Sequence, residues 1–196
     1  MRYADTHKAE TRQRVLKVAA REIRAKGPDN VAVAGVMASA GLTHGGFYAH
    51  FGSKQALISE AIGTMFDDAR QRIATIDSED PKTALRRYVD FYLSKGHRDG
   101  RDRGCPLPAL AGDLVRSGAA AREQFGAGVA GLTNRLANSL NRMGVDNASA
   151  EASSMLAQMV GAVVLSRAVD DAAQADAILA DAHAAIVERY GLGRVQ

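Results

Sequence analysis

One short segment concentrates side chains whose types and spacing could do chemistry. The stretch AGLTHGGFYAHFGSKQAL (40–57) contains two of the five histidines and three of the ten Phe and Tyr rings in the 196-residue chain. Histidines can bind a metal ion, a glycine-rich loop can cradle a phosphate, and a glycine turn before a short helix can enter a nucleic-acid groove. These three possibilities predict different flanking sequences.

The residues around this segment favour neither a metal site nor a phosphate loop. His44 and His50 have no cysteine or carboxylate at ligand spacing, so we expect no metal ion there. A phosphate loop follows a strand, whereas this segment follows an apolar helical run. The chain also shows no Ser/His/Asp set or paired carboxylates. We therefore expect a protein that is not an enzyme and carries no cofactor.

Composition favours a soluble helical protein. Hydrophobic residues make up 46% of the chain, enough for a buried core, and only four prolines interrupt it. The single cysteine excludes an internal disulfide and suits a reducing compartment. The charged N-terminus lacks the apolar region of a signal peptide, and the apolar run 159–165 is too short to span a bilayer. We expect a cytoplasmic protein that does not contact a membrane.

Helical periodicity predicts an all-α fold of about nine helices. The segment 6–27 has an apolar stripe, and its basic residues lie mostly off that stripe. The stripe is Val15, Leu16, Ala19, Ala20 and Ile23, and the basic residues are Arg12, Arg14, Lys17, Arg21 and Arg24. The other helices are expected at about 33–40, 43–51, 54–76, 82–96, 106–117, 119–142, 148–169 and 173–189. We read 77–81 as a turn and 97–104 as a polar loop.

The two short helices around Gly41 predict a DNA-binding helix-turn-helix. Gly41 permits the left-handed turn, and Phe47 and Phe51, four residues apart, fill the small core of the module. Tyr48 points elsewhere, where its hydroxyl can reach a phosphate. The first turn of the second helix meets base edges in the major groove, and it is formed by Thr43, His44, Gly45 and Gly46.

The distribution of charge also separates the segment that contains the predicted helix-turn-helix from the rest of the chain. Residues 1–56 contain nine Lys and Arg against four Asp and Glu, a net charge of +5, whereas the rest of the chain has a net charge of −2. A small basic module therefore precedes a nearly neutral body, as expected of a protein that meets a polyanion. We predict a DNA-binding domain at 1–56 and an effector-binding and dimerisation domain at 57–196.

Over residues 8–60 the sequence resembles the TetR family of transcriptional regulators, most clearly in Tyr48-x-x-Phe51-x-x-Lys54. The resemblance implies a homodimeric, usually repressing protein that binds a near-palindromic operator and responds to a small molecule. It implies a DNA face of Thr43, His44, Gly45, Tyr48 and His50, with Lys54 on a phosphate. One departure is Ala32, where the family usually has a Ser or Thr cap worth roughly 1 kcal/mol.

Cys105 allows two interpretations. A single cysteine among apolar residues is usually a small buried hydrophobe. Here it also precedes a proline-started helix and follows Arg101 and Arg103, an environment that lowers a thiol pKa. Some TetR-like regulators sense electrophiles through such a cysteine, and both interpretations stay open.

The remaining residues of the chain indicate less about the small-molecule effector. Candidate ligand-binding or sensing residues are Cys105, Tyr88, Tyr92, Leu110, Phe125 and Met159, each of which fits a core equally well. Few charges fall among them, so we expect a small apolar or electrophilic effector of unknown identity. The last two helices are expected to form the homodimer. The alternatives are an all-helical enzyme with a pocket in the C-terminal body and an architectural DNA-binding protein without an effector.

Overall fold

The computed structural model describes residues 2–73 and 80–193, and all regular elements in these ranges are helices. In order they are α1 (Arg2–Lys26), α2 (Val33–Ser39), the 3₁₀ helix η1 (His44–Ala49), α3 (Lys54–Ile73), α4 (Pro81–Tyr92), α5 (Lys95–Asp99), α6 (Pro106–Leu114), α7 (Ala119–Arg142), α8 (Ala148–Ala168) and α9 (Ala172–Arg189). The all-α prediction is confirmed. The predicted 82–96 helix ends early, at Tyr92, and the unexpected helix α5 spans the end of that segment and the start of the predicted polar loop. Most of the predicted 77–81 turn lies outside the described residues.

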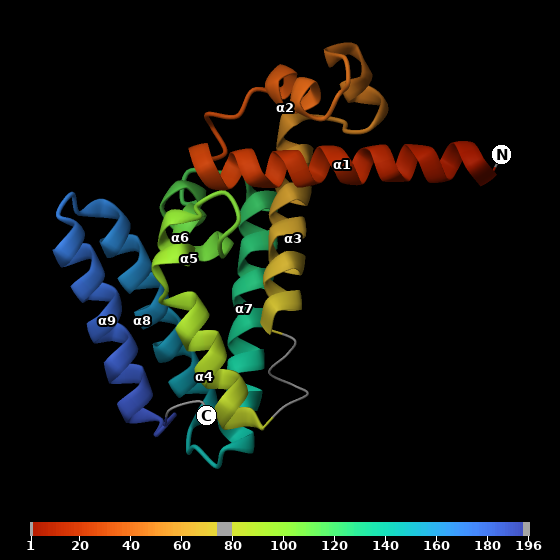
Figure 1. Ribbon diagram of the computed structural model, residues 1–196. Helices are drawn as coiled ribbons and strands as arrows, with labels where there is room; N and C mark the ends of the chain where they lie inside the picture. Colours follow the sequence, from red (N-terminus) through yellow and green to blue (C-terminus); the bar gives the residue numbers. More distant parts are fainter. Residues whose placement is uncertain (1, 74–79, 194–196) are drawn as a thin grey trace.

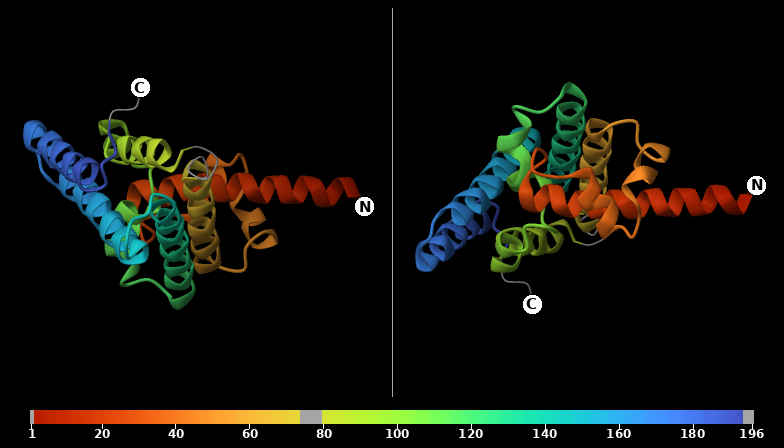
Figure 2. Two further views of the ribbon diagram at one scale, coloured as in Figure 1. Left: turned by 90° about the horizontal axis from the view of Figure 1, so that it is seen from below. Right: turned by 90° about the horizontal axis from the view of Figure 1, so that it is seen from above.

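The helices form a small upper module on a larger body (Figure 1). In that view α1 runs across the top, α2 and η1 lie above it, and α3 descends from the module beside α7. The helices α8 and α9 pair along the opposite edge, far from the projecting N-terminal end of α1 (Figure 2).

The core of the upper module is the one that the apolar periodicity predicts. The α1 stripe is buried, and it packs with α2 and α3. Phe47 and Phe51 are each 2% exposed and stack with their ring centroids 5.7 Å apart. Gly41 has φ +74°, and the Leu42 amide donates to the Met37 carbonyl at 2.9 Å, which closes α2 with a Schellman-type turn. Ala32 precedes α2 without a side-chain cap, as its residue type dictates.

A single unbroken helix, α3, joins the module to the body. It packs on α1 and along α7, and its buried side chains include Leu57, Ile62 and Phe66. The domain boundary that we propose, between residues 56 and 57, therefore falls in the first turn of α3. Gly128 of α7 allows the close approach, because Phe66 occupies the place of a side chain there.

The helix α8 is apolar because it packs mainly on α7 and α9 and also presents an apolar surface. By length and composition alone it is long enough to cross a membrane, but only about a third of its most apolar window is buried inside the chain. It packs between α7 and α9 and leaves Val164 (41%) and Leu165 (57%) exposed. These exposed side chains matter for the assembly proposed below.

Candidate DNA-binding surface and effector cavity

The second element of the helix-turn-helix is a 3₁₀ helix, which the sequence analysis did not predict. In η1 the Gly46 amide donates to the Thr43 carbonyl at 3.1 Å and the His50 amide donates to the Phe47 carbonyl at 2.9 Å. Both bonds close tighter rings than an α-helix does. Gly45 and Gly46 have low α-helix propensity, and the Thr43 side chain makes no cap, so little favours the α form.

Arg12 holds η1 and α3 in place on α1. Its guanidinium lies 4.8 Å from the centre of the Phe51 ring, donates to the His50 carbonyl at 3.3 Å, and pairs with Glu60. Arg12 therefore braces the module, a role that its place off the apolar stripe does not indicate. The Ser53 hydroxyl accepts a bond from the Ala56 amide at 3.0 Å, so Ser53 caps the start of α3.

The residues expected to face DNA are not equally exposed. Thr43, His44, Gly45 and Tyr48 are exposed, and Tyr48 is 73% exposed with only a ring edge on Phe47. Gly46 and His50 are half-buried, and the His50 Nδ1 atom is enclosed without a partner among the described residues. The half-buried Lys54 ammonium donates to the Asp29 carbonyl at 3.1 Å.

The two glycines of η1 are not explained by packing inside the chain. A methyl group at Gly45 would meet nothing within 4 Å, and one at Gly46 would make only ordinary contacts with Met37 and Thr43. Neither residue has a positive φ. No contact among the described residues therefore requires glycine at either position.

A small cavity lies between α1, α3, α4 and the residues before α6. Its lining residues are Arg24, Asp68, Ala69, Arg72, Tyr88, Phe91, Tyr92, Arg103, Gly104 and Cys105. Its volume of about 10 Å³ is room for roughly one water molecule.

The cavity brings together only part of the predicted ligand set. Tyr88, Tyr92 and Cys105 line it. Leu110 and Met159 are fully buried core residues, and Phe125 packs edge-on against Phe66 with the ring centroids 5.6 Å apart.

Cys105 is the N-cap of α6, as its position before Pro106 predicts, but its thiol is not activated. It is 6% exposed, and burial raises its pKa above the usual value. Arg24 and Arg167 lower the pKa, and so do hydrogen bonds, but burial outweighs them. The nearby arginines named in the sequence are engaged elsewhere, because Arg101 donates to the Arg167 carbonyl and Arg103 pairs with Asp102. The thiolate interpretation is not supported, whereas burial fits the packing interpretation.

His97 fixes the backbone beside Cys105, a role that no pattern in the sequence indicates. Its ring is 3% exposed, with Nδ1 2.7 Å from the Tyr92 carbonyl oxygen, and Nε2 accepts from the Cys105 amide at 2.9 Å. Nδ1 therefore carries the proton and donates it. Burial, aided by Arg167, lowers the pKa of His97 to about 4, so the ring is neutral. A methyl group at Gly104 would lie 2.8 Å from Nε2, so only glycine fits there.

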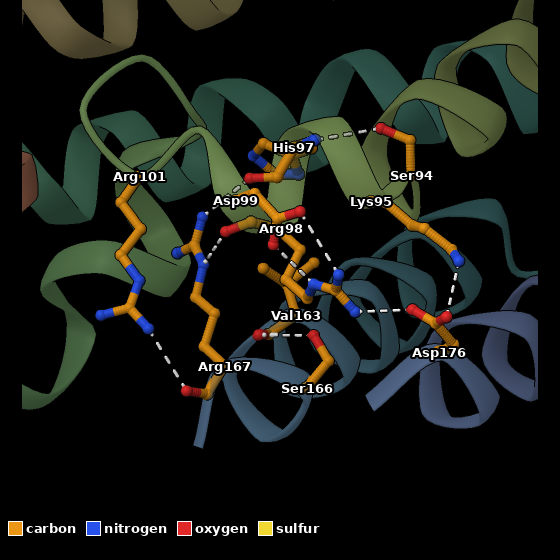
Figure 3. Close-up of polar contacts among 10 residues, drawn as sticks. All are labelled: Ser94, Lys95, His97, Arg98, Asp99, Arg101, Val163, Ser166, Arg167 and Asp176. Atoms are coloured by element: carbon orange, nitrogen blue, oxygen red, sulfur yellow. Dashed lines mark hydrogen bonds and ion pairs between the residues drawn. The ribbon is translucent and has the colours of Figure 1, made fainter. Parts of the chain in front are cut away.

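Arg167 and Arg98 tie the α5 segment to the last two helices (Figure 3). The Arg167 guanidinium, at the end of α8, donates to the carbonyls of His97 and Arg98 at 2.9 Å each. Arg98 donates to Asp176 of α9 at 2.8 Å, and Lys95 reaches the same carboxylate. The wall of the cavity is thus connected to α8 and α9.

Three arginines of the cavity were missed by the sequence analysis. Arg24, placed off the apolar stripe, is 5% exposed and donates to the Met65 carbonyl and to Asp68. A signal was present, because Arg24 follows Leu16 and Ala20 at four-residue spacing, which puts it on their buried face. Arg72 and Arg103 lie on elements whose neighbours cannot be deduced from periodicity.

Comparison with known proteins gives matches at the level of family and fold. Residues 15–61 match the model of bacterial regulatory proteins of the tetR family, and residues 81–180 match the model of the LmrA/YxaF-like transcriptional regulator C-terminal domain. No curated protein matches the sequence.

Solved structures share the fold at low sequence identity. A TetR-family transcriptional regulator from Agrobacterium tumefaciens superposes with a TM-score of 0.79 at 21% identity, covering 93% of this chain and 98% of that one. The reduced form of NemR from E. coli gives 0.79 at 17% identity, covering 90% and 95%. A TetR regulator from Chloroflexus aurantiacus gives 0.78 at 23% identity, covering 93% and 96%. With both family models matched in the order of the two observed parts, the chain belongs to the TetR family of DNA-binding transcriptional regulators.

Proposed function

We propose that this regulator is a homodimeric repressor that binds a near-palindromic operator and is released by a small molecule. The observation that carries the proposal is the exposed face of η1, where His44, Gly45 and Tyr48 project from a braced module. The module also carries the positive charge of the chain, which attracts a polyanion. On this proposal Thr43, His44, Gly45 and Gly46 meet the bases, while Tyr48, His50 and Lys54 lie on the backbone side.

The second half of the proposal concerns assembly. The pair formed by α8 and α9 exposes Val164 and Leu165, and two such pairs related by a twofold axis would bury them as a four-helix interface. A dimer would present two η1 faces, and a twofold protein axis matches a palindromic site. Because the regulator acts on DNA, we place it in the cytoplasm.

The effector class is less constrained than the sequence suggested. The cavity that contains Tyr88, Tyr92 and Cys105 also contains three arginines, so it is not purely apolar. Burial keeps the Cys105 thiol protonated, which lowers its reactivity toward an electrophile. Cys105 remains a candidate sensor, but these observations favour its packing role.

The proposal is tested by selecting duplexes from random DNA with the full-length protein and measuring salt-dependent binding. We expect a palindromic consensus, two protomers per duplex, and a steep loss of affinity with salt. A variant truncated before Ala148 should lose specific binding, because it lacks both dimerisation helices.

Undiminished specific binding by that truncated variant would refute the dimer. Turnover of a small molecule without sequence-specific binding would favour the alternative of an all-helical enzyme. Specific binding with no effector response would favour an architectural protein.

A further inference from the structure

One arginine of α1 joins three elements of the DNA-binding module. The Arg12 Nε atom donates to the carbonyl of His50, the residue that ends η1, at 3.3 Å. The guanidinium carbon lies 4.8 Å from the centre of the Phe51 ring, which stacks on Phe47 of η1. The Nη2 atom pairs with Glu60 in the second turn of α3. A single side chain therefore ties the end of η1 and the start of α3 to α1.

Few interactions within η1 itself favour its shape. It is a 3₁₀ helix of six residues, and the Thr43 side chain makes no cap at its start. Gly45 and Gly46 lower its helix propensity further. Short helices of this kind take their stability from packing rather than from their own hydrogen bonds. Phe47 anchors the middle of η1 in the core and Arg12 holds its end, so the conformation of η1 depends on both contacts.

The contacts of Arg12 are with the protein, and its charge is balanced there by a carboxylate. Its side chain is 34% exposed, and the guanidinium is engaged by the three contacts described above. Arg21 offers a comparison, because it carries the same charge on the same helix. It donates to Asp102 of the body at 2.9 Å, and its side chain is 61% exposed. The two arginines thus differ in what they hold and not in the charge that they bring to α1.

We propose that Arg12 is a positioning residue for operator recognition, which holds η1 in the conformation that meets the bases without binding DNA itself. This role rests on the proposed function, in which the exposed face of η1 reads the operator. A protein that adopts its binding conformation for only part of the time binds more weakly by the same fraction. An η1 that is correctly placed about a tenth of the time therefore lowers the affinity about tenfold. Binding to unrelated DNA depends mainly on the charge of the module and should change little.

The first test compares Arg12→Met with Arg21→Met in the full-length protein. Each substitution removes one positive charge from α1 and keeps an unbranched apolar side chain. Fluorescence anisotropy measures binding to an operator selected by the wild type and to a scrambled duplex of the same length, over a range of salt concentrations. We expect Arg12→Met to bind the operator about tenfold more weakly than Arg21→Met, with equal affinity of both variants for the scrambled duplex.

Two results of this comparison would refute the positioning role. Equal operator affinity of the two variants would show that Arg12 acts through its charge alone. A phosphate contact contributes about 0.9 to the slope of log affinity against log salt concentration. A slope for Arg12→Met that is shallower than that of Arg21→Met by about this amount would show that Arg12 binds DNA itself.

Glu60→Ala separates positioning from charge by the sign of its effect. The substitution removes a negative charge from α3, so charge alone would tighten binding to every duplex. Positioning predicts the opposite for the operator, because Arg12 loses the carboxylate that orients it. We expect operator binding to weaken severalfold, while binding to the scrambled duplex stays equal or tightens. Tighter operator binding by Glu60→Ala would overturn the proposal.

Hydrogen exchange tests the bracing without DNA. The amides of Gly46 and His50 donate within η1, and the Gly27 amide donates to the Ile23 carbonyl at the end of α1. In Arg12→Met the two η1 amides should exchange about tenfold faster, whereas the Gly27 amide should change little. Equal acceleration at all three amides would indicate a general loss of stability, and an unchanged rate in η1 would show that Arg12 does not hold it. Either result contradicts positioning.

Two outcomes distinguish the proposed function from the role of Arg12. A wild-type protein that selects no consensus duplex would refute the proposed function, and with it any role of Arg12 in operator binding, whatever hydrogen exchange shows. Normal selection by the wild type, with operator binding unchanged in Arg12→Met, would refute the role of Arg12 alone.

Discussion

Replacement of Gly128 by alanine tests the closest helix contact of the body. A Cβ atom at this position would lie 2.3 Å from Phe66 Cδ2 and 2.4 Å from Cδ1 and Cε2, whereas carbon atoms in contact are normally about 3.5–4.0 Å apart. Phe66 is 1% exposed, so its ring cannot move without displacing other core side chains. Overpacking of this kind costs about 1–3 kcal/mol. The contact belongs to the α3–α7 pair, which carries the DNA-binding module.

The same helix offers a matched control at Gly126. This glycine is exposed, and an added methyl group would meet nothing within 4 Å. Both substitutions gain roughly 1 kcal/mol of helix propensity, so the difference between the two variants isolates the overpacking.

The two glycine variants are compared by thermal unfolding at equal protein concentration. At about 2–4 °C per kcal/mol, Gly128→Ala should unfold about 2–12 °C below Gly126→Ala. Adding Phe66→Leu should recover part of the loss. Equal midpoints for the two alanine variants would refute the close packing described here.

The remaining predictions concern the DNA surface and two buried groups. Tyr48→Phe and Lys54→Ala should weaken binding about equally for all duplexes, because phosphate contacts carry no sequence information. His44→Ala should change the preferred base at one position of each half-site and cost about 1–3 kcal/mol there; an unchanged selection profile would show that His44 reads no base. Cys105 should resist alkylation below about pH 8.5, since burial raises its pKa, and fast reaction at pH 7 would restore the sensor hypothesis. His97 has a pKa of about 4 in the folded state and about 6.5 when unfolded, so the unfolded chain binds its proton first as the pH falls. Stability should drop by about 3 kcal/mol between pH 7 and 4 and level off below, and His97→Gln should flatten this slope in urea titrations.

Helices with a clear repeat of apolar residues and a recognisable terminating residue were predictable from the sequence. The α1 stripe, the Gly41 turn and the paired Phe47 and Phe51 follow from spacing of three or four residues and from the conformational freedom of glycine. The family resemblance added the positions of η1 that are expected to face DNA, and these positions stay predictions.

The parts that were missed depend on contacts between distant residues. Arg12 reaches Phe51 and Glu60, which lie far along the chain, so its charge suggested only solvation. His97 lies in α5, which has only five residues. A helix this short shows no helical periodicity in the sequence, so the segment looked like a polar loop. The choice between the two interpretations of Cys105 could not be made from the sequence for a related reason, since burial depends on the packing of other helices and not on the neighbouring residues.

The continuity of α3 has a geometric consequence for any dimer. A helix of 20 residues is about 30 Å long, so a tilt of about 5° at one end displaces the other by nearly 3 Å. That displacement is close to the rise of about 3.4 Å per base pair. Without a flexible linker between module and body, a tilt of α3 is the movement that changes the span of the two reading faces, so in a dimer an operator whose half-sites are moved apart by one base pair should bind only with that tilt and therefore more weakly. A pair of glycines inserted in the middle of α3 should relax that requirement, because each module could then turn independently of its body.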